Sequence, residues 1–331
     1  MVKIERIEWL ALLRGLNILL VVMFHVQLID MSTGHNHSFC SDICLPFNPI
    51  RMPLFIFTSG GLLYLSRIRK NIQVKELYYD KFKRIMIPFF FFVIVYYAIK
   101  ILFSQFTKTP TELSLDSFLE CFIYFRGNPS APLWFLAVLM LFMLLYPLYR
   151  YLCQKPYLMV VFMLFCCVFY FVDYGIEEQW NIFFILNIQY YLVYFFFGIF
   201  FFRFELYNYL NSFTAILLLI ITYIAIYFIH IPLLCSLIGI LMMCAITMKI
   251  AQYYPHLFSS FREYIFQIYL MSLPFQGFVE LVLWKRLFYN ENLFLLFYVL
   301  NVLSGILIPV LIAKYIERCN IKFIRLCFGL K

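Results

Sequence analysis

The sequence predicts an all-α integral membrane protein: a polytopic bundle of about ten transmembrane helices with cytoplasmic N- and C-termini. The first observation is composition, because 65% of the 331 residues are hydrophobic, 13% are charged and the mean hydropathy is +0.89. Soluble domains of this length are far less apolar. The second is a series of apolar runs long enough to cross a bilayer. The third is that Lys and Arg gather in alternate connections, a pattern typical of membrane orientation.

Ten apolar stretches account for most of the chain. Because lipid offers no partners to backbone N–H and C=O groups, each stretch is expected to be a helix. The first begins after a basic N-terminus, but it is too long for a signal peptide and carries Arg14, so we expect it to be retained. The expected spans are 9–29, 50–65, 85–103, 133–149, 157–172, 182–202, 213–229, 233–249, 264–283 and 293–313.

The distribution of basic residues predicts the orientation. Loop 66–84 holds seven Lys and Arg, and the tail after Ala313 holds five. The connections 30–49 and 173–181 hold none. An even number of spans places both termini on one side, and the positive charge places them in the cytoplasm. The expected organisation is a ten-span membrane domain, 1–313, and a basic amphipathic cytoplasmic tail, 314–331.

The tryptophans and cysteines fit this interpretation. The four tryptophans fall near expected span ends, as interfacial anchors do. Five cysteines lie in or beside apolar runs and are expected to act as small buried hydrophobes. These residues are Trp9, Trp134, Trp180 and Trp284, and Cys121, Cys166, Cys167, Cys235 and Cys244.

The first span carries two ionisable residues, Arg14 and His25. Eleven helical steps bring them back to within about 20° of one face, roughly 16 Å apart along the axis. Ionisable side chains inside a span favour a functional role; the alternative is an Arg that snorkels and a His that a neighbouring helix satisfies. Asn17 lies one turn above Arg14 and could join it. A desolvated His25 near the outer face would be neutral and able to act as a base.

The basic loop 66–84 permits two interpretations. Such a loop is a topology signal and a contact for lipid headgroups. Alternatively, it is a phosphate site, because Arg grips phosphate oxygens with two donors at once. A phosphorylated cofactor from the cytoplasm would then bind Arg67, Arg69 and neighbouring Lys70 or Arg84.

Several motifs together resemble the acyltransferase-3 family of integral membrane acyltransferases, in particular its sugar O-acetyltransferase, fucose 4-O-acetylase-like branch. The matching motifs cover roughly the first 140 residues in order, and they are Arg14-x10-His25, RMPLFIFTSGGLLY (51–64), SRIRK (66–70), KFKRIMIP (81–88) and PLWFL (132–136).

The resemblance implies transfer of an acyl group, most simply acetyl, from cytoplasmic acyl-CoA to a carbohydrate hydroxyl at the outer face. It implies that His25 is the catalytic base and Arg14 its essential companion. It also implies that Arg67 and Arg69 serve the CoA phosphates. The sequence departs from the family where Met271 and Ser272 follow Tyr269 and Leu270, a place where members often have His.

Other residues could complete the site. Two acids could orient His25: Glu280 in the ninth span and Asp30 at the exit of the first. Arg14 and backbone donors near Ser59 and Gly60 are candidates for stabilising an oxyanion. Loop 31–49 carries His35, His37, Cys40 and Cys44, whose spacing matches no standard zinc pattern; no metal is expected, and the two cysteines could form a disulfide.

The sequence therefore predicts a membrane O-acyltransferase of the bacterial inner (plasma) membrane that modifies a polysaccharide or lipid-linked glycan. Its expected partners are acyl-CoA as co-substrate, the carbohydrate acceptor and membrane lipids; the net charge of +9 reflects topology, so no nucleic acid is expected. The alternative from another class is a transporter or flippase for a lipid-linked sugar, with Arg14 and His25 lining its path. A peptide or antibiotic acceptor also remains open.

Overall fold

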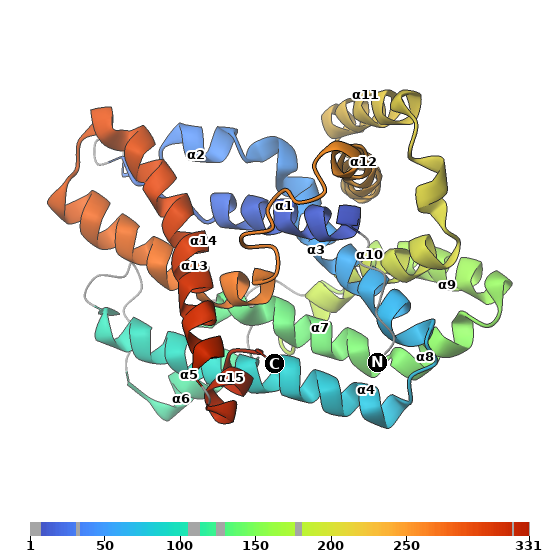
Figure 1. Cartoon of the computed structure of the whole chain (residues 1–331), viewed down its shortest axis with the longest axis horizontal. Helices are drawn as coiled ribbons and strands as arrows, with labels where there is room; N and C mark the ends of the chain where they lie inside the picture. Colours follow the sequence, from blue (N-terminus) through green and yellow to red (C-terminus); the bar gives the residue numbers. More distant parts are fainter. Residues whose placement is uncertain are drawn as a thin grey trace. The chain divides into compact units, whose positions relative to one another are not determined.

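The computed structural model describes residues 8–30, 34–104, 113–123, 130–175, 181–319 and 321–330. Within these ranges the regular structure is helical, apart from isolated bridge residues such as Ile29 and Asn36, which confirms the all-α class (Figure 1). The chain divides into two compact units. The first unit comprises Met1–Thr58 and Phe204–Tyr315, and the second comprises Ser59–Arg203 and Ile316–Lys331.

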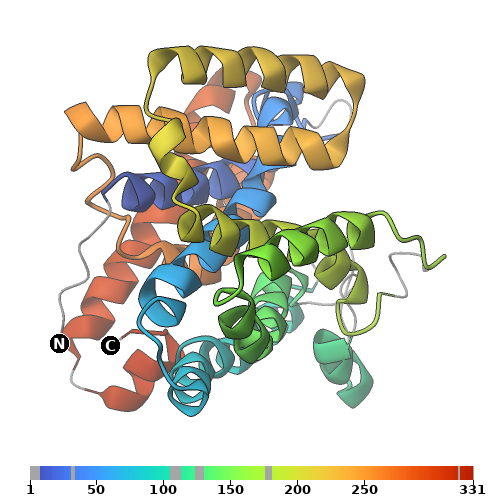
Figure 2. The ribbon, with the colours of Figure 1, turned by 90° about the vertical axis from the view of Figure 1, so that its right-hand side faces the viewer.

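The first unit is built around helix α1 (Glu8–Phe24), which packs against α12 (Pro232–Tyr253) and α13 (Ile265–Phe278). Most of α1 is buried although it is the first helix of the chain. Helix α11 lies alongside α12 (Figure 2). The remaining elements of this unit are α2 (Ser38–Asp42), α3 (Asn48–Leu63) up to Thr58, α11 (Phe213–Ile229) and α14 (Phe294–Arg318) up to Tyr315.

The start of α3 is fixed by the α11–α12 pair. The Ser212 hydroxyl caps α11 by accepting the Ala215 N–H at 3.0 Å, and a left-handed residue, His230, ends that helix. Ser236 on α12 donates to the Pro49 carbonyl at 2.7 Å. Gly239 lets Ile50 approach α12 so closely that a Cβ there would collide with the Ile50 side chain. These contacts hold the first turn of α3 in place.

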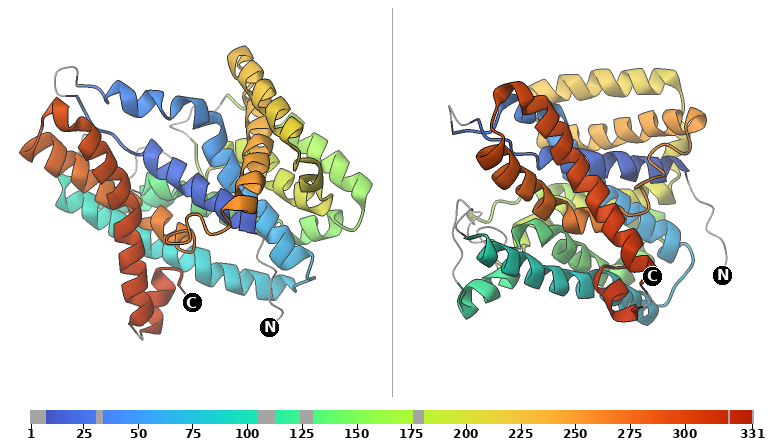
Figure 3. Two further views of the ribbon diagram at one scale, coloured as in Figure 1. Left: turned by 45° about the horizontal axis from the view of Figure 1, so that its top comes forward. Right: turned by 60° about the vertical axis from the view of Figure 1, so that its left-hand side comes forward.

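Helix α13 continues into a π-helical segment, Val279–Leu287, and the turn after it leads into α14 (Figure 3). Trp284 in this segment is buried, and its indole N–H donates to the Ile29 carbonyl at 2.8 Å. The prediction that Trp284 is an interfacial anchor is therefore wrong: the indole sits in an apolar cluster with Val26 and Leu28. Trp180 lies outside the described residues.

The second unit contains the basic loop and most of the aromatic residues. Helix α9 packs along α10, and α15 packs on α5, where Phe328 contacts Phe91 and Phe92. All ten cysteines of the chain are free thiols, and among the five expected to be buried only Cys167 is partly exposed. The helices are α4 (Val74–Lys81), α5 (Ile87–Leu102), α6 (Leu115–Ile123), α7 (Trp134–Leu144), α8 (Tyr146–Leu152), α9 (Pro156–Tyr170), α10 (Ile185–Arg203) and α15 (Lys322–Cys327).

The count of ten spans is not supported. In the described ranges, five helical segments are long and apolar enough to cross a membrane, or six if a pair bent by 53° counts as one span. The five are Val74–Leu102, Ile185–Arg203, Pro232–Tyr253, Ile265–Leu287 and Glu291–Arg318, and the bent pair is Ala131–Leu144 with Tyr146–Leu152.

The four remaining stretches form shorter helices. The expected span 9–29 stops being helical after Phe24, so α1 has 17 residues. The expected span 50–65 corresponds to α3, whose 16 residues include Pro53. Helices α9 and α11 are apolar but have 15 and 17 residues. Because five spans would separate the termini and six would place them on one side, the cytoplasmic placement of both ends is likewise not supported.

Candidate functional site

His25 follows α1 directly, and its ring caps the end of that helix. The His25 backbone N–H donates to the Val22 carbonyl at 3.1 Å instead of continuing the α-helical ladder to Val21. The Val21 carbonyl is left for the imidazole, whose Nδ1 lies 2.7 Å from it. A carbonyl oxygen can only accept, so Nδ1 carries the proton. In the neutral ring Nε2 is then the nitrogen that can accept a proton.

A cation from a second helix lies beside this ring, and sequence reasoning missed it. The Arg51 guanidinium carbon sits 3.5 Å above the centre of the Phe24 ring, in a cation–π contact one residue before His25. Arg51 is close enough to His25 and to Cys44 to act on both electrostatically. The sequence did offer a signal for Arg51. It is a basic residue at the start of an otherwise apolar stretch, and it opens the motif 51–64.

Arg14 and Asn17 lie in the middle of α1. Arg14 is partly buried, whereas Asn17 is fully buried. Neither polar atom of the Asn17 amide has a hydrogen-bond partner in the described part of the chain, so Asn17 does not join Arg14 through a hydrogen bond. Arg14 lies within α1 and His25 lies just beyond its end, eleven residues further along the chain.

The two candidate acids lie beyond the end of α1. Asp30 accepts a hydrogen bond from the Tyr289 hydroxyl at 3.2 Å. Glu280 lies beside α2: burial raises the pKa of the Cys40 thiol to about 11, and the Glu280 carboxylate adds to that increase. The Val21 carbonyl accepts the hydrogen bond from His25 Nδ1 and so orients the ring. Neither acid occupies that position.

In the His- and Cys-containing loop, His35 is exposed, whereas the two cysteines are buried. The His37 ring stacks on Phe294 with centroids 3.8 Å apart, and Cys40 and Cys44 are buried free thiols. Burial also raises the pKa of Cys44, which the Arg51 guanidinium opposes. Among the residues that the structure describes, no three His, Cys, Asp or Glu side chains gather as a metal site.

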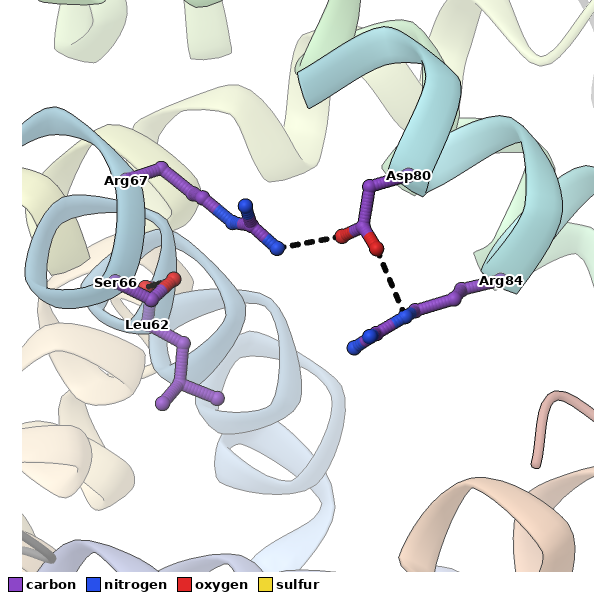
Figure 4. Close-up of polar contacts among 5 residues, drawn as sticks. All are labelled: Leu62, Ser66, Arg67, Asp80 and Arg84. Atoms are coloured by element: carbon purple, nitrogen blue, oxygen red, sulfur yellow. Dashed lines mark hydrogen bonds and ion pairs between the residues drawn. The ribbon is translucent and has the colours of Figure 1, made fainter. Parts of the chain in front are cut away.

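In the second unit, Asp80 joins two arginines of the basic loop. Arg67 Nη2 lies 2.6 Å from Asp80 Oδ2, and Arg84 Nε lies 2.9 Å from Asp80 Oδ1 (Figure 4). The two arginines come from opposite ends of the loop, one from a π-helical turn, Tyr64–Ile68, and the other from a second one, Phe82–Met86. Sequence reasoning missed Asp80, whose single carboxylate fixes two of the expected phosphate ligands.

The other residues expected to bind phosphate lie in the same loop as the two bridged arginines. Arg69 and Lys70 are exposed after the first π-helical turn, as is Arg84. The Tyr146 hydroxyl donates to the Ile72 carbonyl at 2.7 Å, which anchors the loop to α8. Ser66 donates to Leu62 at 2.5 Å within its own helix (Figure 4). The structure therefore presents an Arg67–Asp80–Arg84 bridge with the exposed side chains of Arg69 and Lys70 in the same loop.

Ser59 and Gly60 lie inside α3, where helical backbone N–H groups bond to carbonyls one turn back. Their N–H groups belong to this helical ladder, so the helix lends no support to the prediction that they stabilise an oxyanion. Gly60 is small for another reason: a Cβ there would overlap the Phe195 carbonyl of α10. At Gly61 a Cβ would overlap the Phe202 ring. The glycine pair allows α3 and α10 to pack closely.

Comparison with known proteins identifies the family. A family model described as an acyltransferase domain matches residues 7–314, nearly the whole chain. No curated protein and no solved structure matches the chain. The matched region contains the α1 motif, the basic loop and the apolar helices, which together are consistent with an integral membrane enzyme. On this evidence the chain belongs to the acyltransferase-3 family and is a membrane acyltransferase.

Proposed function

We propose that this protein transfers an acetyl group from acetyl-CoA to a carbohydrate hydroxyl, with His25 as the general base. The observation that carries the proposal is the state of the imidazole. Its Nδ1 proton is committed to the Val21 carbonyl at 2.7 Å, which leaves Nε2 as the proton acceptor. The family supports acyl transfer in general.

The chemistry needs one base and one cationic stabiliser. Nε2 of His25 accepts the hydroxyl proton while the hydroxyl oxygen attacks the thioester carbonyl. The C–S bond of the resulting tetrahedral oxyanion then breaks, and the His25 proton passes to the departing CoA thiolate. Arg51, which lies beside His25, and Arg14 of α1 are the candidates for stabilising the oxyanion.

The donor is expected to bind through its phosphates at the basic loop of the second unit. Arg67 and Arg84 are held by Asp80, and Arg69 and Lys70 stand exposed next to them. A guanidinium has five N–H donors, so the bond to Asp80 leaves others on Arg67 for phosphate oxygens. The seven basic residues of this loop support its placement in the cytoplasm, where acyl-CoA is made.

We place the enzyme in a bacterial plasma membrane, acting on a polysaccharide or lipid-linked glycan. Membership of an acyltransferase family favours this function over transport or flipping of a lipid-linked sugar.

The test is a transfer assay with purified protein in lipid vesicles, using acetyl-CoA labelled in the acetyl group and extracted membrane glycans as acceptors. Label should reach glycan with the wild type and with His256→Ala, a control in an exposed turn. With His25→Ala it should not, although the protein remains inserted. Label on peptide alone would change the acceptor class, and no consumption of acetyl-CoA would overturn the proposal.

A further inference from the structure

Three helices of the first unit meet beside the end of α1, and amide side chains fill the junction. Gln276 on α13 donates through Nε2 to the Val22 carbonyl of α1 at 2.9 Å. Asn301 on α14 donates through Nδ2 to the Gln276 backbone carbonyl at 3.3 Å. Gly305, one turn further along α14, lies so close that a Cβ there would meet both Val22 and Gln276. The junction therefore holds α1, α13 and α14 in direct contact.

These hydrogen bonds fix which way each amide points. Both acceptors are backbone carbonyls, so the NH2 groups must face them and the side-chain oxygens must point away. Gln276 and Asn301 are 1% and 0% exposed. In the described part of the chain, neither Gln276 Oε1 nor Asn301 Oδ1 has a hydrogen-bond partner. Buried carbonyl oxygens are nearly always paired, so within the described chain the two oxygens at this junction are unused acceptors for a group that donates hydrogen bonds.

A third polar atom without a partner lies on the same face of α14. Tyr298, Asn301 and Gly305 are spaced three and four residues apart, which places them on one side of the helix. The Tyr298 hydroxyl is buried and, within the described residues, makes no hydrogen bond. Its ring packs edge-on against Phe39 of α2 and belongs to the apolar cluster that contains Val26.

The junction adjoins the segment that carries His25. The Val22 carbonyl that accepts from Gln276 also accepts the His25 backbone N–H, at 3.1 Å. Val26, on the other side of His25 in the chain, lies in the cluster with Tyr298. A ligand that satisfies Gln276, Asn301 and Tyr298 is therefore held next to the imidazole.

The chemistry of the atoms selects the ligand. Two of them are neutral acceptors and the third is a hydroxyl, so they favour a neutral molecule with several O–H donors. A phosphate or carboxylate, which only accepts, would find no donor on the two amide oxygens. We infer that Gln276, Asn301 and Tyr298 form the subsite that binds the hydroxyl groups of a carbohydrate acceptor and holds one of them at His25. This inference deepens the proposed function and rests on it.

The experiment measures binding without turnover. The full chain in lipid nanodiscs is heated with and without methyl α-D-glucoside, methyl α-L-fucoside or acetyl-CoA, and each ligand's effect on Tm is titrated. Gln276→Met and Asn301→Leu remove the orphan oxygens at nearly constant volume, Tyr298→Phe removes only the hydroxyl, and Ser304→Ala is the control. Ser304 lies on α14 with its hydroxyl already bonded to the Asn301 carbonyl.

The glycosides should raise the Tm of the wild type and of Ser304→Ala. In the three subsite variants the glycoside concentration that gives half of the shift should rise by about tenfold, while the acetyl-CoA shift is unchanged. A wild type that no glycoside stabilises, or variants that respond like the wild type, would overturn the subsite. If the variants instead lose the Tm shift caused by acetyl-CoA, the three residues belong to the donor site. The transfer assay is independent, so a protein that binds glycosides without consuming acetyl-CoA refutes the transfer alone.

Discussion

The end of α1 and the basic loop handle polar groups in opposite ways. At the end of α1, His25 bonds to a backbone carbonyl, and amide oxygens nearby have no partner within the described residues. In the basic loop, the single carboxylate of Asp80 pairs with both Arg67 and Arg84, so it offsets only part of their positive charge. The first region has a cation, Arg51, beside the imidazole and buried amide oxygens without partners among the described residues, which suits proton transfer and the binding of a neutral acceptor. The second is charged and pre-organised, which suits the recognition of an anion.

This contrast predicts different responses to salt. The basic loop is partly exposed, so added salt should weaken its attraction for an anionic donor. The groups around His25 are largely buried and are screened much less. Substitutions in the two regions should therefore separate into effects on turnover and effects on the KM for acyl-CoA.

The largest effect among the cations should come from Arg51. Arg51→Leu removes the charge beside His25, and if Arg51 stabilises the oxyanion, kcat should fall by about a hundredfold or more. Steady-state rates of label transfer would measure it. Lys249→Leu is the matched control, because Lys249 also lies over an aromatic ring, Tyr253, at 6.0 Å. A normal kcat in Arg51→Leu would restrict Arg51 to packing on Phe24.

A smaller effect is expected in the basic loop. Arg67→Gln should raise the KM for acyl-CoA by about tenfold with little change in kcat, because a charge-assisted bond to phosphate is lost. The difference from the wild type should shrink at high salt. Lys75→Gln, an exposed charge on α4 of the same loop, serves as the control. An unchanged KM would remove Arg67 from the donor site.

Asp80→Asn should act in the same direction but more weakly. The substitution removes the charge that holds Arg67 and Arg84 in place. The two side chains must then lose conformational freedom when the donor binds, so we expect the KM for acyl-CoA to rise by about threefold. A fall in KM would show instead that Asp80 competes with the donor phosphates for the two arginines. Either result is read from the same kinetic assay.

The smallest effect on activity should come from Gly60. Gly60→Ala places a Cβ against the Phe195 carbonyl and should destabilise the protein by about 1–3 kcal/mol, without a change in kcat for the folded fraction. Gly277→Ala is the matched control, because a Cβ at Gly277 meets nothing within 4 Å. It should be neutral or stabilise by about 0.5–1 kcal/mol. Thermal unfolding of the two variants tests the assignment.

Local spacing was enough to predict some features. The Arg14–His25 pair and the charge of the loop are properties of one continuous segment, so the sequence alone indicated both. Helicity also followed from composition, whereas the number of spans did not. The expected first span, 9–29, required the first helix to continue to Ile29. Instead the His25 ring bonds to the Val21 carbonyl and the helix ends at Phe24.

The missed residues depend on contacts between distant segments. Arg51 reaches His25 from a different helix, and Gln276 reaches Val22 across 254 positions of the chain. Asp80 was one of two acids in a loop with seven basic residues, and only the fold shows that it bridges two of them. Ser59 and Gly60 remain predicted site residues, and the structure adds that Gly60 allows close packing on Phe195, which the small-residue motif did not reveal.

The assignment of His25 as the proton acceptor is tested most directly by chemical rescue. Transfer of labelled acetyl is measured with purified His25→Ala in lipid vesicles, with and without added imidazole. We predict a fall of about 10²–10⁴-fold in the rate and a partial recovery that rises with imidazole concentration. A His25→Ala enzyme that transfers acetyl at the wild-type rate without imidazole would contradict the assignment.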